Sequence, residues 1–566
     1  MRHARRRHGE VAPQVLGGAP ARVTAGPGSA YEPSRGVRLA VLAVVLLVAA
    51  VLRWTPADRV ADLRPWPDAL EYEEAARSLY AGRGYQLWIG GDAYPPRYPP
   101  GTSLLIAATM PLAGTAGGTG IFAVLACALA AVAGTYVLAT MAGGTVSGLI
   151  AALLLALSPV HVQWSRAVMS DVPASAAVVW LAAGVLALLA RRARPAAWLL
   201  LGVACGLAGS IRYAVWALLP AACVTVALLG PGPPALRAKQ LAALLAGAAL
   251  GVAPLLWLNA ELFGSALRDG YGYWVRDTLL APGRIVAGGA DASPGNLRFY
   301  GGQLLGLGTL YPWPAGVLLV LGTVVAARGT TPARALATLA WLVAGALLVL
   351  LAGFLWQWDR LLLPVLPLVM ALMALPCGGA SSLRLRVPAL ALAGLVVALG
   401  ASAREHFAPP DGIAYDVATL RRIARIAEPD AAVLARSNAF AFARELRTDG
   451  ADRVWVPLQL DVHAAAIEAG RLVPLRRAPG EGGWIREAVR RPFSPSRALA
   501  TVDALCREGR PVYLSEQLDL YVALLPELKQ ALADRFGLTE VLAAEPYRVH
   551  RVACPPPGAD SGRATR

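Results

Sequence analysis

Residues 67–72 have the sequence Pro-Asp-Ala-Leu-Glu-Tyr, and residues 94–101 have the sequence Tyr-Pro-Pro-Arg-Tyr-Pro-Pro-Gly. Both segments come soon after residues 37–53, an apolar run that is long enough to cross a bilayer as a helix. Acidic groups and rigid proline turns directly after a membrane span predict chemistry at the membrane surface.

The whole chain is more apolar than a water-soluble protein of its length. Of its 566 residues, 56% are hydrophobic and 16% are charged, whereas soluble domains have about 45–50% apolar and about 25% charged residues. Apolar runs long enough to span a bilayer occur at 37–53, 119–141, 144–161, 172–190, 196–211, 213–230, 241–260, 303–327, 335–355, 361–377 and 387–402. The sequence therefore predicts a polytopic α-helical membrane protein with about eleven transmembrane helices.

The formal charge of +16 comes almost wholly from arginine, since Lys239 and Lys529 are the only lysines. The basic run at residues 2–7 has two interpretations, which are a nucleic-acid-binding patch and a cytoplasmic segment. Next to a first span, such a run is typical of a cytoplasmic segment under the positive-inside rule, so we expect no nucleic-acid partner. Residues 1–36, rich in Pro, Gly, Ala and Arg, are expected to form a disordered cytoplasmic tail without a cleavable signal peptide.

The apolar segment at residues 101–114 decides the topology. It is bounded by Pro100 and Pro111, and such a short segment is expected to lie at the membrane interface. If it does not span, the basic residues of the short loops all lie on the side of the N-terminus, as the positive-inside rule requires. These residues are Arg191, Arg192, Arg194, Arg237, Lys239, Arg328, Arg334, Arg384 and Arg386. The loop at 54–118 and residues 403–566 then face outward.

With the sides fixed in this way, polar residues gather at the outer face. They are Asp68, Glu71, Arg97, His161, Arg166, Asp171, Arg212, Asp359 and Arg360. Charges near hydrocarbon cost about 2.5–3.5 kcal/mol at a helix centre, so they tend to be functional. Arg212 and Arg360 have two interpretations, which are snorkelling to the interface and bidentate binding of an anionic headgroup.

The acidic residues also have a structural alternative. Asp68 with Glu71 three residues later fits a capping box that opens a helix ending at Gly82 or Gly84, and Asp171 fits the start of a span. The prolines of residues 94–101 predict a stiff extended strap, for which a rigid linker is the alternative.

Several motifs, taken in order, resemble glycosyltransferase family thirty-nine, the GT-C group of protein O-mannosyltransferases and aminoarabinose transferases. These motifs are Pro67-Asp68, residues 75–79, residues 94–101 followed by Ser103-Leu104-Leu105, Ser158-Pro159 with residues 165–173, and Trp358-Asp359-Arg360 with Pro364 and Pro367. The resemblance covers residues 37–377, which would form a GT-C catalytic domain ending with the last span near residue 402. It implies an enzyme of the plasma membrane that moves a sugar, with inversion, from a polyprenyl-phosphate carrier to an acceptor glycan, lipid or protein on the outer face.

The resemblance also implies roles for residues. Asp68 would be the general base, and Asp171 would orient the acceptor or a metal. Arg360, Arg212 and Arg97 would bind the donor phosphate and stabilise its developing charge. The acceptor or the sugar would be bound by Glu71, Tyr72, Tyr98, His161 and Arg166. Many relatives have a second acidic residue where this chain has Ala69, so a divalent metal cofactor stays an open question.

Residues 403–566 have a soluble composition. Short strands at 432–435, 454–458 and 511–514 alternate with helices at 439–447, 461–469, 497–508 and 522–535, which predicts an extracytoplasmic α/β domain with a largely parallel sheet. Cys506 and Cys554 are predicted to form a disulfide there, because an outer location permits one.

Two other classes of function fit parts of the sequence. A transporter or flippase of an anionic lipid-linked sugar also has many spans and buried arginines, although transporters usually carry internal repeats and polar residues near the midplane. A non-catalytic cell-envelope assembly protein would use the outer domain for binding only. The sequence offers no Walker motif and no Gly-rich dinucleotide fingerprint, so the energy for a transfer must arrive in an activated donor.

Overall fold

A computed structural model describes most of the chain. The described residues are 34–54, 67–89, 92–115, 118–271, 294–352, 357–378, 383–402, 422–435, 453–457, 476–477, 495–517, 525–544 and 547–555. The predicted tail at 1–36 lies almost wholly outside these ranges, and so do the helices predicted at 439–447 and 461–469.

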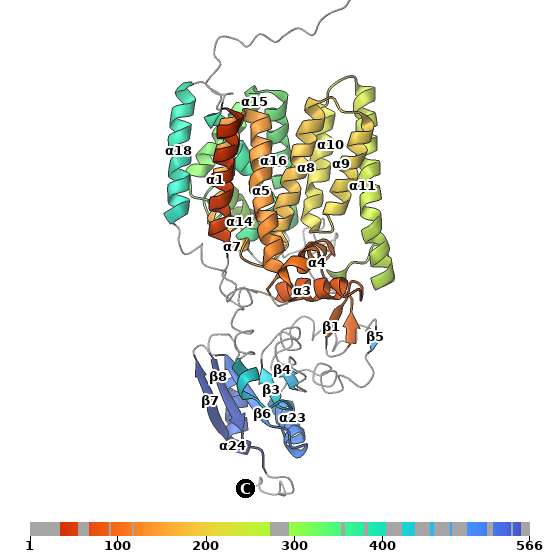
Figure 1. Cartoon of the computed structure of the whole chain (residues 1–566), viewed down its shortest axis with the longest axis vertical. Coiled ribbons are helices and arrows are strands. Elements are labelled where there is room, and N and C mark those ends of the chain that lie inside the picture. Colours follow the sequence, from red (N-terminus) through yellow and green to blue (C-terminus); the bar gives the residue numbers. More distant parts are fainter. Residues whose placement is uncertain are drawn as a thin grey trace, which may run out of the picture.

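The larger part of the structure is a bundle of apolar helices (Figure 1). Within the described ranges, five helices are long and apolar enough to cross a membrane: α1 (Arg35–Arg53), α5 (Gly120–Gly143), α8 (Asp171–Ala190), α11 (Pro234–Phe263) and α16 (Thr331–Ala352). Shorter helices of the bundle are α6 (Thr145–Ala156), α9 (Pro195–Ala208), α10 (Leu218–Leu229), α14 (Pro294–Leu304), α15 (Pro314–Arg328), α17 (Leu366–Met373) and α18 (Leu383–Ser402). The chain is therefore a multi-pass membrane protein, whereas the count of eleven spans stays a prediction.

Four glycines let α9 and α11 pack at backbone distance: Gly202, Gly206, Gly247 and Gly251. A Cβ atom at Gly202 would lie 2.1 Å from the carbonyl oxygen of Leu244, and one at Gly247 would lie 2.0 Å from that of Leu199. Small residues allow this close approach, which drives helix association inside a membrane. The packing fixes the ends of both helices, where the chain continues to Arg212 and to Tyr271.

One end of the bundle carries the polar loops. Figure 1 shows α3 (Pro67–Tyr80) and α4 (Gly101–Ala113) there, on the same side as the C-terminal sheet. Helix α3 begins at Pro67, so Asp68 lies in its first turn rather than at the predicted cap position, and it ends before Gly82, which has a φ of 69°. Helix α4 lies beside α3, where an interfacial helix was expected. The strap of residues 94–100 joins β2 to α4.

Asp171 begins α8 at the end of the bundle that carries the polar loops, and α8 then runs for 20 residues. A helix of this length covers about 30 Å, so the arginines that follow it lie at the opposite end. Asp171 and the arginines that follow α8 thus lie at opposite ends of this helix.

The C-terminal region contains a five-stranded sheet in the order β4-β3-β6-β8-β7. Its strands are β3 (Ala432–Ala435), β4 (Val454–Pro457), β6 (Val512–Gln517), β7 (Leu538–Ala544) and β8 (Tyr547–Val552), with the helices α23 (Pro495–Arg507) and α24 (Leu525–Phe536). β3 is parallel to β4 and β6, but β8 is antiparallel to β6 and β7. The three strands predicted from the sequence, β3, β4 and β6, are thus parallel as expected, whereas β7 and β8, which were not predicted, add an antiparallel half to the sheet. The two residues between β7 and β8 can connect only antiparallel strands.

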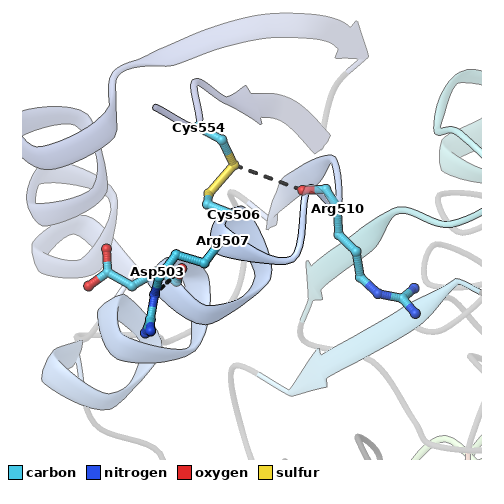
Figure 2. Close-up of a disulfide and its surroundings, with 5 residues drawn as sticks. All are labelled: Asp503, Cys506, Arg507, Arg510 and Cys554. Carbon is cyan, nitrogen blue, oxygen red and sulfur yellow. Dashed lines mark hydrogen bonds between the residues drawn. A yellow bond between two sulfur atoms is a disulfide. The ribbon is translucent and has the colours of Figure 1, made fainter. Parts of the chain in front are cut away.

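A disulfide joins Cys506, near the end of α23, to Cys554, just after β8 (Figure 2). The Cα atoms of the two cysteines are 5.2 Å apart. The bond fastens the last strand to the helix that precedes β6, and the pairing predicted from the sequence is present.

A second, small sheet connects the segment between α3 and α4 to the C-terminal region. The hairpin of β1 (Leu87–Ile89) and β2 (Asp92–Tyr94) pairs through β2 with β5 (Arg476–Arg477). Both regions therefore lie on the same side of the bundle.

Candidate active site

The first group of polar side chains joins α3 to the strap. Nη2 of Arg97 lies 3.0 Å from Oδ1 of Asp68 and 3.5 Å from Oε2 of Glu71. The backbone N–H of Arg97 donates to Oε1 of Glu71, and Nη2 of Arg97 also donates to the hydroxyl of Tyr98. Glu71 is buried, whereas the side chain of Asp68 is 24% exposed. The acid that faces open space in this group is therefore Asp68.

The protonation of this group follows from its surroundings. Burial lowers the pKa of Arg97, but the neighbouring Tyr98, Glu71 and Asp68 raise it above the ordinary value of an arginine. Burial also raises the pKa of Tyr98 well above its usual value, against the opposing effect of Arg97. Arg97 therefore stays charged and Tyr98 stays neutral at physiological pH.

The second group surrounds Asp171, at the first position of α8. Oδ1 of Asp171 lies 3.0 Å from Nη1 of Arg212, and Oδ2 lies 3.4 Å from Nη1 of Arg360. Arg212 immediately precedes the short helix η1 (Tyr213–Ala217), and Arg360 lies in the short helix η2 (Asp359–Leu362). The side chain of Asp171 is 0% exposed. One buried carboxylate thus holds two guanidinium groups together.

Two indole rings enclose the guanidinium of Arg360. Its Cζ atom lies 4.8 Å from the ring centroid of Trp164 and 4.4 Å from that of Trp358. Such cation–π contacts stabilise a cation that is removed from water. Nε of Arg360 is buried and has no hydrogen-bond partner among the described residues. The group therefore retains a buried N–H donor for an additional acceptor.

Ser170 links the two groups into one site. Its Oγ accepts hydrogen bonds from the hydroxyl of Tyr72 at 3.0 Å and from Nη1 of Arg212 at 2.9 Å. The ring of Tyr72 stacks on the ring of Tyr98, with centroids 4.6 Å apart. A continuous path of contacts thus runs from the Asp68 group to the Asp171 group.

His161 lies in a different environment from the one that its predicted role requires. Its Nδ1 is 2.9 Å from Nη2 of Arg53, the last residue of α1. Arg53 also donates to Oγ of Ser165 and to the carbonyl oxygens of Ala49, Leu155 and Ala156. His161 is buried with Arg53 where α1, α6 and α7 (Pro159–Trp164) meet. Arg166, which was also predicted to bind the acceptor or the sugar, is half-buried in the turn between α7 and α8.

Sequence reasoning gave no role to four residues in or beside the site: Arg53, Trp164, Ser170 and Tyr271. Arg53 resembled an ordinary basic residue flanking a span, Trp164 belongs to no motif, and Ser170 lies in the motif at residues 165–173 but was assigned no function. Tyr271 was also passed over, although its ring lies edge-on to Tyr98 with centroids 5.5 Å apart. The available signal was its position in an outward loop shortly after a span.

The carboxylates of the site are engaged by arginines. The described part of the chain holds no group of three or more His, Cys, Asp or Glu side chains arranged to bind a metal ion. Because Asp68 and Asp171 each contact guanidinium groups, the residues present do not fit a metal centre. We therefore derive no step through a metal.

The comparisons with known proteins agree with the fold. Residues 97–257 match the family model described as dolichyl-phosphate-mannose-protein mannosyltransferase. This segment contains Arg97, Asp171 and Arg212. No curated protein matches the sequence.

Solved structures resemble nearly the whole chain. ArnT from Cupriavidus metallidurans bound to undecaprenyl phosphate has a TM-score of 0.61 at 15% identity, covering 92% of this chain and 98% of that one. The apo state of the same ArnT has a TM-score of 0.61 at 15% identity, covering 91% and 98%. The oligosaccharyltransferase AglB from Archaeoglobus fulgidus, with an inhibitory peptide and a dolichol-phosphate, has a TM-score of 0.51 at 13% identity, covering 91% and 74%.

These likenesses establish the fold. The chain has the fold of the GT-C glycosyltransferases, and its predicted resemblance to glycosyltransferase family thirty-nine is confirmed. At these identities the solved structures establish the fold alone.

Proposed function

We propose that this chain is an inverting glycosyltransferase that moves a sugar from a polyprenyl-phosphate carrier to an acceptor hydroxyl. One observation carries the proposal: a partly exposed carboxylate, Asp68, lies on the same connected site as two arginines gathered by Asp171. A transfer from a lipid phosphate needs a base at one end and cations at the other.

Exposure separates the roles of the two aspartates. Asp171 is buried and held by Arg212 and Arg360, whereas the side chain of Asp68 is 24% exposed. A general base must reach the proton that it removes, so Asp68 is the base. Arg97, for which the sequence suggested phosphate binding, contacts Asp68 and Glu71 and would hold the base in place.

The bond changes then follow. The acceptor oxygen attacks the anomeric carbon of the sugar and passes its proton to Asp68. The bond between that carbon and the phosphate oxygen breaks, and its electron pair leaves with the lipid phosphate. Arg212 and the indole-enclosed Arg360 stabilise the charge that develops on this phosphate. Asp171 keeps the two guanidinium groups close enough to bind it together.

The reaction is placed on the outer face of the plasma membrane, with the N-terminus in the cytoplasm. Two features support this orientation. The disulfide between Cys506 and Cys554 fits an oxidising compartment, and the pairing of β2 with β5 places the first outer loop on the same side as the C-terminal region. The α/β domain at 403–566 would then stand over the site that residues 37–402 form.

Replacement of the base tests the proposal. We expect Asp68→Asn to lower transfer by about 10²- to 10⁴-fold, the usual contribution of a general base. Glu74→Gln is the control, because Glu74 is on the same helix but only pairs with Arg77 at 3.7 Å. The assay follows sugar transfer in membranes supplied with polyprenyl-phosphate-linked sugars. Near-normal turnover of Asp68→Asn would refute the role of Asp68.

A second measurement separates an enzyme from a flippase. Purified protein in liposomes is given a lipid-linked sugar and a pool of acceptors from the cell envelope. An enzyme releases polyprenyl phosphate as the sugar is transferred, whereas a flippase moves the intact lipid-linked sugar between leaflets. Movement without release would contradict the proposed function.

A further inference from the structure

Tyr271 occupies a fixed position beside the site. Its ring lies edge-on to Tyr98, with centroids 5.5 Å apart, and is tilted against Tyr213, with centroids 6.1 Å apart. The preceding residue, Gly270, packs directly on the strap, because a Cβ atom there would lie 2.3 Å from the carbonyl oxygen of Arg97. The segment after α11 is thus held against the residues that carry the base group.

Ring contacts place Tyr271 between the two groups of the site. Tyr98, on one side, follows Arg97 of the base group, and Tyr213, on the other, follows Arg212 of the arginine group. Burial raises the pKa of Tyr271, the cations of Arg212 and Arg97 lower it, and the carboxylates of Asp68 and Glu71 raise it, with a net increase. The hydroxyl therefore keeps its proton at physiological pH.

In the proposed reaction, the space between the two groups is where the transferred sugar lies. Asp68 faces the acceptor oxygen, and Arg212 and Arg360 face the leaving phosphate. The part of the substrates between these points is the anomeric carbon with its sugar ring. A neutral hydroxyl on an aromatic ring is suited to this place, since it both donates and accepts hydrogen bonds and offers an apolar face for packing.

We propose that Tyr271 binds the transferred sugar and contributes to its selection. Its hydroxyl hydrogen-bonds a hydroxyl of the sugar, and its ring packs against the sugar face. This inference rests on the proposed function. A site that hydrogen-bonds a substrate hydroxyl discriminates against analogues that lack it, so the ligand is a polyprenyl-phosphate glycoside rather than the bare lipid phosphate.

The test compares lipids with and without sugar. Purified full-length protein is titrated with undecaprenyl phosphate and with its mannosyl and pentosyl glycosides, and the glycoside that the wild type binds most tightly is used further. We expect Tyr271→Phe to weaken binding of this glycoside by about two- to tenfold, the worth of one hydrogen bond. Binding of undecaprenyl phosphate should not change.

Tyr213→Phe is the matched control. Tyr213 also contacts the ring of Tyr271, but its hydroxyl hydrogen-bonds Asp269. It should bind both kinds of lipid like the wild type. Since Tyr271→Phe removes a single oxygen atom and retains the ring contacts, it should remain folded, which the melting temperature checks.

Each other outcome overturns the inference. Equal affinities of Tyr271→Phe and the wild type for the glycoside would show that the hydroxyl does not contact the sugar. Parallel loss of affinity for undecaprenyl phosphate would place Tyr271 on the phosphate instead. If the wild type binds none of these lipids, the proposed function fails together with this inference, whereas a wild type that binds and transfers leaves the proposed function standing.

Discussion

Replacing Asp171 by asparagine should destabilise the protein because it leaves a buried cation, Arg360, and a half-buried one, Arg212, without their carboxylate. The side chains of Asp171 and Arg360 are 0% and 5% exposed, and that of Arg212 is 24% exposed. Removing one partner of a buried ion pair costs about 3–5 kcal/mol. Solvent screens part of the contribution of Arg212, so we expect a loss of about 3 kcal/mol.

The same substitution should increase the stabilisation by a lipid phosphate. In the wild type, the carboxylate of Asp171 already pairs with both arginines and offsets part of their charge, whereas in Asp171→Asn a bound phosphate supplies the missing negative charge. A ligand that binds the native state raises its melting temperature according to its affinity. The melting temperature of purified protein is therefore measured with and without undecaprenyl phosphate, and the increase should be larger for the variant.

Asp359→Asn is the control for this experiment. Asp359 neighbours Arg360 in the sequence, but it is half-buried and accepts a hydrogen bond from Thr309 at 2.7 Å. It should melt near the wild-type temperature and show the wild-type increase with lipid. If Asp171→Asn behaves in the same way, then Asp171 does not hold the arginines for a phosphate.

Three further predictions concern the surroundings of the site. Glu73→Gln should lower transfer. The carboxylate of Glu73 accepts hydrogen bonds from the backbone N–H groups of Gly118 and Gly120, at 3.0 and 3.1 Å, and so fixes α3, which carries the base, against the start of α5. Wild-type turnover would contradict this. Gly247→Ala should destabilise the bundle by about 1–3 kcal/mol, whereas Gly345→Ala, which meets open space, should not; equal melting temperatures would refute the backbone packing. Glu428 receives hydrogen bonds from Tyr513 and Arg551 at 2.6 and 2.7 Å, and although burial raises its pKa, these contacts bring the pKa below its usual value. Its stabilisation is therefore complete above the unfolded pKa and lost as the pH falls through the lower folded pKa. The protection of the β6 and β8 amides, measured relative to the intrinsic exchange rate at each pH, should therefore fall in acid, and Glu428→Gln should remove this dependence.

Much of the site was predictable because the order of spans and loops along the chain determines at which end of the bundle each loop residue lies. Once residues 101–114 were excluded as a span, Asp68, Asp171, Arg212 and Arg360 had to meet at one end of the bundle. The topology did not predict which acidic residue contacts which arginine. That pairing depends on side-chain direction and on the path of the strap, which places Arg97 against Asp68 rather than beside the other arginines.

Other features depend on contacts that no local pattern reports. The bonds from Arg53 to carbonyl oxygens of α6 join segments about a hundred residues apart, so the arginine looks ordinary in its own apolar run. The strands β7 and β8 were not predicted, so the antiparallel pairs that β8 forms with β6 and β7 were missed. The disulfide was predictable, since Cys506 and Cys554 are the two cysteines outside the apolar runs.

The charges of the site suggest how it serves both ends of the proposed reaction. Three carboxylates, from Asp68, Glu71 and Asp171, contact three guanidinium groups, so these side chains balance one another before substrates bind. A phosphate that links a lipid to a sugar carries one negative charge, and the released lipid phosphate carries about −1.5 to −2 at neutral pH, as other phosphate monoesters do. Transfer thus adds negative charge beside Arg212 and Arg360 at the moment when Asp68 gains a proton. The charge of the occupied site is conserved through the step, and the partial exposure of Asp68 lets its proton leave to water before the next turnover.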